Sequence, residues 1–449
     1  MDSIIYFVII SLLSRGALAQ VLEKAEHQTP NAEQTSEFYG ETQAMIYKGQ
    51  INSFLKSAQD ELQQDILPFW IKYCQDNEYG GFIGRMSNDG TITKDAPKGL
   101  VLNARILWTY SAAYRFSKNN EYLEMAKRSF NYLMQHFVDK QHGGAYWLLD
   151  YNGKAIDDSK ELYGQSFLIY GLAEYFLATG DKAALEKAKE LFSLIEEHCH
   201  DDANKGYFET FNRDWSPTEK ARLASGSAKE KKTMNTHLHL LEAYTNLYRV
   251  WKDEKVKTRL IELIEIFQKH IINSKTFHFE LFFDEKWHST NNIVSFGHDI
   301  EGSWLLCEAA EVLGQPNIAA TVREWSLKMA QAVYEQGLDK DGALFYEGRD
   351  GKIINSDKEW WPQAETVVGF LNAYQLSGDE KFLQASIKCW EFIEQRIVDH
   401  KHGEWFWRVR RDGMPDMREP KVSEWKCPYH NARACFETIR RLRAINKGG

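Results

Sequence analysis

Histidine, asparagine and glutamate recur at helical spacing in two segments of the second half of the chain. Asn235 and His239 are four residues apart, and His298 and Glu301 are three apart, so each pair shares one face of a helix. Imidazole can accept and donate a proton near neutral pH, and a neighbouring carboxylate fixes its tautomer and raises its pKa. These pairs could therefore transfer protons, although a buried structural hydrogen bond or a simple ion pair is the alternative for each.

Residues of metal-binding type occur in the same segments. His237 and His239 are two residues apart, so on a helix they point to different faces and cannot easily bind one ion together. The six cysteines are scattered without a CxxC pair, which is typical of buried free thiols. We expect neither a metal site nor any other cofactor.

Other segments carry polar and aromatic residues of similar kind. The full set is Asn103 to Arg105, Glu161 to Gln165, Asn235 to His239, Gly297 to Trp304, Glu359 to Glu365 and Trp425 to His430. Singly, each has a structural interpretation: Arg105 could pair with a structural carboxylate, and Trp361 and Trp425 could belong to the core. Their positions relative to the predicted helices argue otherwise.

Helices must position these segments. Apolar residues recur at three- and four-residue spacing in 100–116, 121–137, 163–178, 182–198, 233–251, 255–272, 297–312, 317–336, 360–376 and 380–397. Adding 42–65 and 428–445 gives twelve helices in six pairs. The residues named above lie near the starts of the even-numbered helices.

A short element rich in glycine and aromatic residues separates the helix pairs. It occurs six times, from Gly80–Gly84 to Gly403–Trp407, and its copies lie roughly 60 to 70 residues apart, a spacing typical of stacked supersecondary units. Turn sequences such as Asn88-Asp89-Gly90 and Arg411-Asp412-Gly413 close most copies and predict small β-hairpins. Six hairpin-linked pairs predict an all-α closed ring, with six helices inside and six outside. Because no flexible linker interrupts it, we expect one domain over 42–449.

Such a ring would gather the polar segments. Parallel inner helices that start at one end of a ring bring their N-termini to one mouth, and helix N-termini carry partial positive charge that suits an oxyanion. Convergence from six repeats is a stronger indication than any single motif.

Composition excludes some partners and favours others. The net charge is −9 and no run of Lys or Arg stands out, so nothing favours binding to nucleic acid or an anionic membrane. The aromatic content is 13% with 14 Trp, which suits core packing and stacking on sugar rings. We expect a small-molecule sugar partner and a monomer or weak dimer.

The N-terminus resembles an export signal. An apolar run, Ile4–Leu13, is followed by Ala17-Leu18-Ala19, although Asp2 and the lack of Lys or Arg before the run are atypical. The run is too short to span a bilayer. We expect a signal peptide at 1–19, a loose leader at 20–41, and export to the periplasm or medium, with a cytoplasmic location as the alternative.

In its polar and aromatic segments the chain resembles the N-acylglucosamine 2-epimerase superfamily and, within it, the cellobiose 2-epimerases. The resemblance covers roughly residues 42 to 445. Its carrying segments are Asn103–Trp108, Tyr163–Phe167, Asn235–Tyr244, Gly297–Glu301, Trp361–Glu365 and Trp425–His430. The implied fold is an (α/α)6 barrel, in agreement with the twelve helices, and the leader is the main departure.

The resemblance also implies roles for individual residues. His298 and His430 are the expected acid/base pair, and Glu301 is expected to orient a catalytic histidine. Arg105, Tyr163, Asn235 and His239 are expected around the reacting C1–C2 oxygens. Trp361 and Trp425 are expected to stack on sugar, with Trp304 and Glu365 shaping the pocket. The implied activity is cofactor-independent inversion at C2 of the reducing-end glucose of disaccharides such as cellobiose and lactose.

Four alternatives remain open from the sequence. An N-acylglucosamine 2-epimerase or an aldose–ketose isomerase would use the same proton-transfer groups on a monosaccharide. A glycoside hydrolase on the same barrel would need two carboxylates across the scissile bond, for which Asp299, Glu301, Glu365 and Glu404 are candidates. A non-catalytic binding module would leave the two histidines without a role.

Overall fold

The computed structural model describes residues 47–218 and 230–448. The chain divides into two compact units, Met1–Ser53 and Phe54–Gly449, and the second unit contains every element named below. The expected signal peptide at 1–19 and leader at 20–41 lie outside the described residues, and the expected domain boundary at residue 42 stays a prediction.

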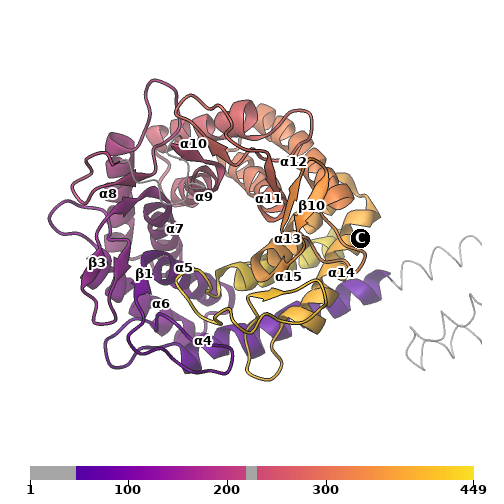
Figure 1. Ribbon diagram of the computed structural model, residues 1–449, viewed down its shortest axis with the longest axis horizontal. Coiled ribbons are helices and arrows are strands. Elements are labelled where there is room, and N and C mark those ends of the chain that lie inside the picture. Colours follow the sequence, from indigo (N-terminus) through magenta and orange to yellow (C-terminus); the bar gives the residue numbers. More distant parts are fainter. Residues whose placement is uncertain (1–46, 219–229, 449) are drawn as a thin grey trace, which may run out of the picture. The chain divides into compact units, whose positions relative to one another are not determined.

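Six helices form a closed inner ring in the second unit, as Figure 1 shows. They are α5 (Leu100–Ser117), α7 (Leu162–Thr179), α9 (Met234–Val250), α11 (Phe296–Leu313), α13 (Trp360–Ser377) and α15 (Tyr429–Gly448). Each contacts the next, and α15 contacts α5. The inner helices α5, α7, α9, α11 and α13 are buried around most of their circumference, because neighbouring helices flank them and the outer helices cover them. These are the even-numbered helices of the prediction.

The outer helices are amphipathic. They are residues 54–60 with η1 (Glu61–Ile66) and α4 (Leu67–Tyr73), α6 (Asn120–Tyr132) with η2 (Leu133–Phe137), α8 (Lys182–His198), α10 (Glu254–Ile266) with η3 (Phe267–Ile271), α12 (Pro316–Gln336), and α14 (Glu380–Phe392) with η4 (Ile393–Ile397). Each packs against an inner helix, and α10 and α12 each pack against two, α9 and α11 for the first and α11 and α13 for the second. Within the described part of the chain this makes twelve helices, so the predicted all-α (α/α)6 barrel is confirmed.

The first predicted helix was too short. It was expected to end at residue 65, but the helix continues through Pro68 to Tyr73. Proline clashes with the preceding turn of a regular α-helix. Here the wider π-type turn of Glu61–Ile66 comes first, and Leu67 donates its backbone N–H to Leu62 five residues back, which relieves that clash.

Short strands join each repeat to the next. They are β1 (Lys98–Gly99), β2 (Leu148–Leu149), β3 (Ala155–Asp157), β4 (Lys160–Glu161), β5 (Thr210–Phe211), β6 (Lys232–Thr233), β7 (Phe282–Phe283), β8 (Ile293–Ser295), β9 (Glu347–Arg349), β10 (Lys352–Asn355), β11 (Lys358–Glu359) and β12 (Arg408–Val409). Hairpins β2–β3 and β9–β10 confirm two of the predicted turns. The predicted turns at 88–90 and 411–413 are closed by isolated β-bridges, Met86–Ile92 and Val409–Pro415. The strand before each inner helix pairs with the hairpin of the following repeat, as in β1–β2, and a Met86–Val422 bridge closes the circle.

Buried ion pairs fix the starts of most inner helices. A lysine just before the helix, or in the last repeat a few residues earlier, binds an aspartate in the turn of the preceding hairpin at 2.5 to 3.0 Å. The pairs are Lys98–Asp76, Lys160–Asp139, Lys232–Asp201, Lys358–Asp339 and Lys421–Asp399. Because each lysine is almost fully buried, removing its aspartate would leave an uncompensated charge.

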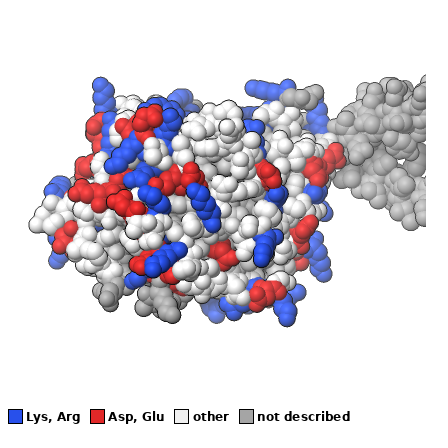
Figure 2. Space-filling view, turned by 90° about the horizontal axis from the view of Figure 1, so that it is seen from above, with Lys and Arg blue, Asp and Glu red and all other residues white. Residues whose placement is uncertain are grey.

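The surface and the thiols agree with the sequence analysis. On the face seen in Figure 2, acidic and basic side chains intermingle rather than gather by sign. Among the described residues, no helix combines the length and apolar character needed to cross a bilayer. All six cysteines are free and buried.

Candidate active site

A cavity of about 240 Å³ opens where the inner helices begin. We call it the site cavity. Its walls come from all six inner helices and the loops before them. The lining residues are Arg105, Tyr163, Asn235, His239, His298, Glu301, Tyr346, Glu359, Trp360, Trp361, Trp407, Trp425 and His430. The expected convergence of the helix starts on one mouth is therefore observed.

Nine of the eleven residues singled out from the sequence line this cavity. The two exceptions are Trp304 and Glu365, which were expected to shape the pocket but lie behind its wall. Both are buried, and the indole Nε1 of Trp304 donates to Oε2 of Glu365 at 3.0 Å. Both lie one turn further into the helices than the residues that reach the cavity, so their contacts are with other side chains.

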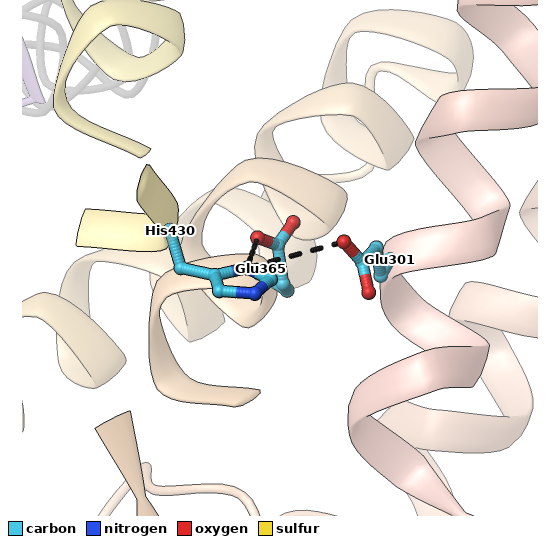
Figure 3. Close-up of side chains that lie close together, drawn as sticks. All are labelled: Glu301, Glu365 and His430. Carbon is cyan, nitrogen blue, oxygen red and sulfur yellow. Dashed lines mark hydrogen bonds and ion pairs between the residues drawn. The ribbon is translucent and has the colours of Figure 1, made fainter. Parts of the chain in front are cut away.

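Three histidines in the cavity wall are held in the same way, through Nδ1. His239 contacts Oε2 of Glu242 at 3.0 Å, His298 contacts Oγ of Ser295 at 2.7 Å, and His430 contacts Oε1 of Glu365 at 2.7 Å. Figure 3 shows the His430–Glu365 contact. In each ring, Nε2 is the nitrogen left for a ligand.

The carboxylate that orients a histidine differs from the expectation. Glu301 lies three residues after His298 but does not contact it. Its Oε1 is 4.0 Å from Nδ1 of His430 (Figure 3). The same oxygen is 2.6 Å from Nη2 of Arg433. Glu365 contacts His430 instead. The i, i+3 spacing was a poor guide here because the neutral Ser295, at the N-cap of α11, takes the position beside His298.

Burial lowers the pKa of all three imidazoles. It lowers the pKa of His298 to about 3, assisted by repulsion from His239, and lowers the pKa of His430 far below its usual value, assisted by Arg105 and Arg433. The pKa of His239 is also lowered, chiefly by burial. The expected rise of a histidine pKa beside a carboxylate is therefore not found at these three side chains, because desolvation outweighs it.

Arg433 lies at the centre of a buried charge cluster beneath the cavity. Its guanidinium pairs with Glu242, Glu301 and Glu365, which belong to three different inner helices. In the described part of the chain, Glu301, Glu365 and His430 form the one group of metal-ligand type. Because Arg433 already supplies positive charge to both carboxylates, the cluster is arranged as an ion-pair network.

Arg105 provides a fixed cation in the wall of the site cavity. Its Nη2 donates to the hydroxyl of Tyr163 at 3.0 Å, and its guanidinium lies over the Phe167 ring at 4.2 Å. Buried polar atoms without a protein partner occur on four lining residues: Nε of Arg105, Oδ1 of Asn235, Oε2 of Glu301 and Nε1 of Trp360. Unpaired groups of this kind are typical of sites that bind polar ligands.

Other candidates from the sequence face away from the cavity. Nε2 of His237 accepts the backbone N–H of Tyr207 at 3.0 Å, so His237 and His239 do point apart. Asp299 accepts the backbone N–H of Phe279 and contacts His278. Glu404 binds Lys426, Asn431 and Trp70.

Sequence reasoning missed several residues of the site. Glu242 and Arg433 each follow a cavity histidine by three residues, and this spacing could have identified them. Tyr346 and Trp407 come from the loops and carried no periodic signal, while Glu359 belonged to one of the polar segments but was given no role. Burial raises the pKa of Glu359 to about 7.

Comparison with known proteins covers all segments that line the site cavity. The sequence matches the family described as N-acylglucosamine 2-epimerase (GlcNAc 2-epimerase) over residues 81–434. A cellobiose 2-epimerase of Bacteroides fragilis is 48% identical over 382 residues, 85% of this chain and 97% of that protein. One of Dictyoglomus turgidum is 41% identical over 85% of this chain and 97% of that protein. The solved cellobiose 2-epimerase of Bacillus thermoamylovorans superposes with a TM-score of 0.84, at 41% identity, over 87% of this chain and 100% of that one.

Proposed function

The chain belongs to the N-acylglucosamine 2-epimerase family, and we propose that it inverts C2 of the reducing-end glucose of β-1,4-linked disaccharides. On this proposal it interconverts cellobiose with glucosyl-mannose and lactose with epilactose. It is a carbohydrate epimerase, and the relatives reported above carry the name cellobiose 2-epimerase. The reaction as proposed uses only side chains of this chain.

The observation that carries the proposal is the placement of two imidazoles in one cavity. His298 and His430 come from different helices, and the ring of Trp361 lies 4.6 Å from the first and 5.7 Å from the second, between centroids. Inversion at carbon needs proton removal from one face and proton return to the other. Two imidazoles can do both, each being the base in one direction and the acid in the reverse.

The chemistry starts with opening of the sugar ring, which gives a C1 aldehyde that acidifies the C2 proton. One imidazole takes that proton and leaves an enediolate. The second imidazole, protonated when the step begins, returns its proton to the opposite face of C2, which gives the mannose configuration and leaves the first imidazole protonated. Return of the proton to C1 instead would give a ketose.

The developing oxyanion requires a positive partner. Arg105 supports this role, since its guanidinium is buried, charged and fixed against Tyr163 and Phe167. Asn235 and His239 would bind the C1–C2 oxygens from α9. Glu365 would position His430, and Glu301 would share Arg433 with it.

The disaccharide is favoured over a monosaccharide by a second cavity. A space of about 270 Å³ adjoins the site cavity and shares Trp407 and Trp425 with it. Indole rings suit stacking on a sugar unit. The reducing-end residue would occupy the site cavity, and the other sugar unit would lie along these two indoles.

The hydrolase alternative has weak support from the carboxylates. A glycosidase needs two carboxyl groups that flank the scissile bond. Asp299 and Glu404 are bonded to groups away from the cavity, and Glu301 and Glu365 are neutralised by Arg433. None of the four candidates belongs to a free pair across the cavity.

Proton NMR in D2O tests the proposal directly. Cellobiose, and separately lactose, would be incubated with the protein. We expect the mannose-ended product with deuterium at C2. Release of free glucose without exchange at C2 would contradict the epimerase and support the hydrolase, and a ketose product would identify an aldose–ketose isomerase. Turnover of N-acetylmannosamine in preference to both disaccharides would support the monosaccharide epimerase.

The compartment and the assembly are also proposals. We expect removal of residues 1–19 on export, which N-terminal sequencing of the protein purified from its native cell would detect. An intact Met1 in the cytoplasmic fraction would contradict it. Light scattering should give a monomer or a weak dimer.

A further inference from the structure

Glu242 lies behind the wall of the site cavity and is buried, with 2% of its surface exposed. It is on α9, three residues after His239. Its two oxygens have different partners: Oε2 contacts Nδ1 of His239 at 3.0 Å, while Oε1 accepts from the hydroxyl of Tyr429 and from Nη1 of Arg433. Both oxygens are therefore engaged.

The charge on Glu242 is well defined. Burial alone would raise its pKa, but Arg433 and the contacts with His239 and Tyr429 outweigh burial and lower the pKa to about 2. An ionised carboxylate has no proton to donate. The hydrogen between Oε2 and His239 must therefore be on Nδ1 of the imidazole, which is neutral because burial lowers its pKa.

From this geometry we propose that Glu242 is a positioning residue that keeps the proton of His239 on Nδ1, so that Nε2 accepts a hydrogen bond from a substrate hydroxyl. The proposal rests on the proposed function for the identity of that hydroxyl, which would be on C1 or C2 of the sugar. Glu242 does not line the cavity, and its effect on the substrate passes through His239.

Arg433 links this pair to a second one. The same guanidinium binds Glu242 through Nη1 and Glu365 through Nη2, and Glu365 holds Nδ1 of His430. Two histidine–carboxylate pairs on opposite sides of the ring thus share one cation. Arg433 lowers the pKa of Glu242, whereas at Glu365 it only partly offsets the rise in pKa that burial causes.

Glu242→Gln makes the proposal sharp. Tyr429 and Arg433 are both donors toward Oε1, so the amide oxygen must take that side and the amide NH2 must face His239. Nδ1 would then have to accept a hydrogen bond, and the proton would move to Nε2. The nitrogen that faces the substrate would become a donor instead of an acceptor.

Nitrogen-15 NMR of the histidine rings, in substrate-free protein, shows directly which ring nitrogen of His239 carries the proton. We expect His239 to be protonated on Nδ1 in the wild type and on Nε2 in E242Q. The readout needs no turnover, so it stands even if the protein acts on another sugar. A His239 proton on Nε2 in the wild type, or an unchanged tautomer in E242Q, would overturn the proposal.

Kinetics provide the second measurement. We expect E242Q to lower kcat at least about 100-fold, since a wrong histidine tautomer removes a catalytic contact rather than the site. In the His239→Gln background, E242Q should cause little further loss, below about threefold. Losses that multiply in the double variant would mean that Glu242 acts independently of His239, against the proposal.

Glu174→Gln is the matched control. Glu174 is also buried, on the neighbouring inner helix α7, where it binds Arg115 and Asn246 away from the cavity. E174Q should leave the His239 tautomer and kcat unchanged.

If E242Q fails to fold, Glu242→Asp provides a second variant. It withdraws the carboxylate by one methylene, so it should loosen the Nδ1 contact and lower kcat with the tautomer retained.

Discussion

His237 and His239 are two residues apart on one inner helix, and they have opposite environments. On the outward face, His237 is saturated: Nε2 accepts the backbone N–H of Tyr207 at 3.0 Å, and Nδ1 contacts the carbonyl of Thr233 at 2.7 Å. On the inward face, His239 is held only through Nδ1 and lines the site cavity. The same residue type is a structural anchor on one face and a candidate ligand contact on the other.

The contrast repeats on other inner helices. On the outward face, Gln165 bonds the backbone of Ala145, Asp299 that of Phe279, and Gln363 that of Leu344. Each of these three, like His237, is the fourth residue of its helix. The outward face thus binds the hairpins and fixes each helix start, so the inward face can project its side chains into one cavity.

The largest effect should come from the inward face. His298→Asn or His430→Asn should lower kcat for cellobiose about 10³-fold or more, because each removes one proton-transfer group. The melting temperature should change little, since among the described residues the imidazole of His298 has one hydrogen bond, to Ser295, and that of His430 has one, to Glu365. Discontinuous assays of the mannose-ended product measure the loss. Activity within tenfold of wild type in both variants would remove the acid/base assignment.

The two neighbouring histidines allow a direct test of the comparison. His237→Gln should destabilise the fold by about 1 to 3 kcal/mol, because it leaves the buried N–H of Tyr207 without its acceptor, while kcat stays near wild type. His239→Gln should instead lower kcat and leave the free energy of unfolding near that of the wild type. Denaturant unfolding and steady-state kinetics on both variants give the answer. Equal effects of the two substitutions on kcat would refute the division between the faces.

Unfolding measured over a range of pH gives a further test of His237. Burial lowers the pKa of His237 to about 3, so between pH 6.5 and 3 the unfolded chain binds a proton that the folded chain does not. This contribution to stability is complete above pH 6.5 and is lost as the pH falls. The destabilisation caused by His237→Gln should therefore shrink by about 1.4 kcal/mol per pH unit below 6.5.

The exposed His288 is the control for that series. Its side chain is 76% exposed and contacts only Asp284, one turn away. His288→Gln should change the free energy of unfolding by no more than about 0.5 kcal/mol, as expected for a surface substitution. A pH-independent destabilisation in His237→Gln would mean that the imidazole is not kept neutral by the fold.

The smallest effect concerns the aromatic wall. Trp425→Phe should raise KM for cellobiose about 2- to 13-fold, which corresponds to the 0.5 to 1.5 kcal/mol of an aromatic stacking contact. kcat should change less, because Trp425 contacts Trp147 and Tyr163 rather than His298 or His430. Initial rates over a range of cellobiose concentrations separate the two constants. A fall in kcat at unchanged KM would assign Trp425 to the chemistry instead.

The sequence determined the repeat, the helices and the convergence of their starts. Spacing of three and four residues between apolar side chains specifies a helix locally, and glycine-containing turns specify hairpins locally, so both could be predicted without tertiary contacts. Closure into a ring followed from six copies of one unit. For the same reason, nine of the residues singled out from the sequence lie in one cavity.

Only the tertiary structure decided the partners of those residues. His430 and Glu365 are 65 positions apart and Arg433 joins three different helices, so no local spacing predicts these contacts. Local spacing even favoured Glu301 over Ser295 as the neighbour of His298. Sequence periodicity assigns a residue to a face of its own helix, whereas the hydrogen-bond partner, and with it the pKa, depends on which other helices pack against that face.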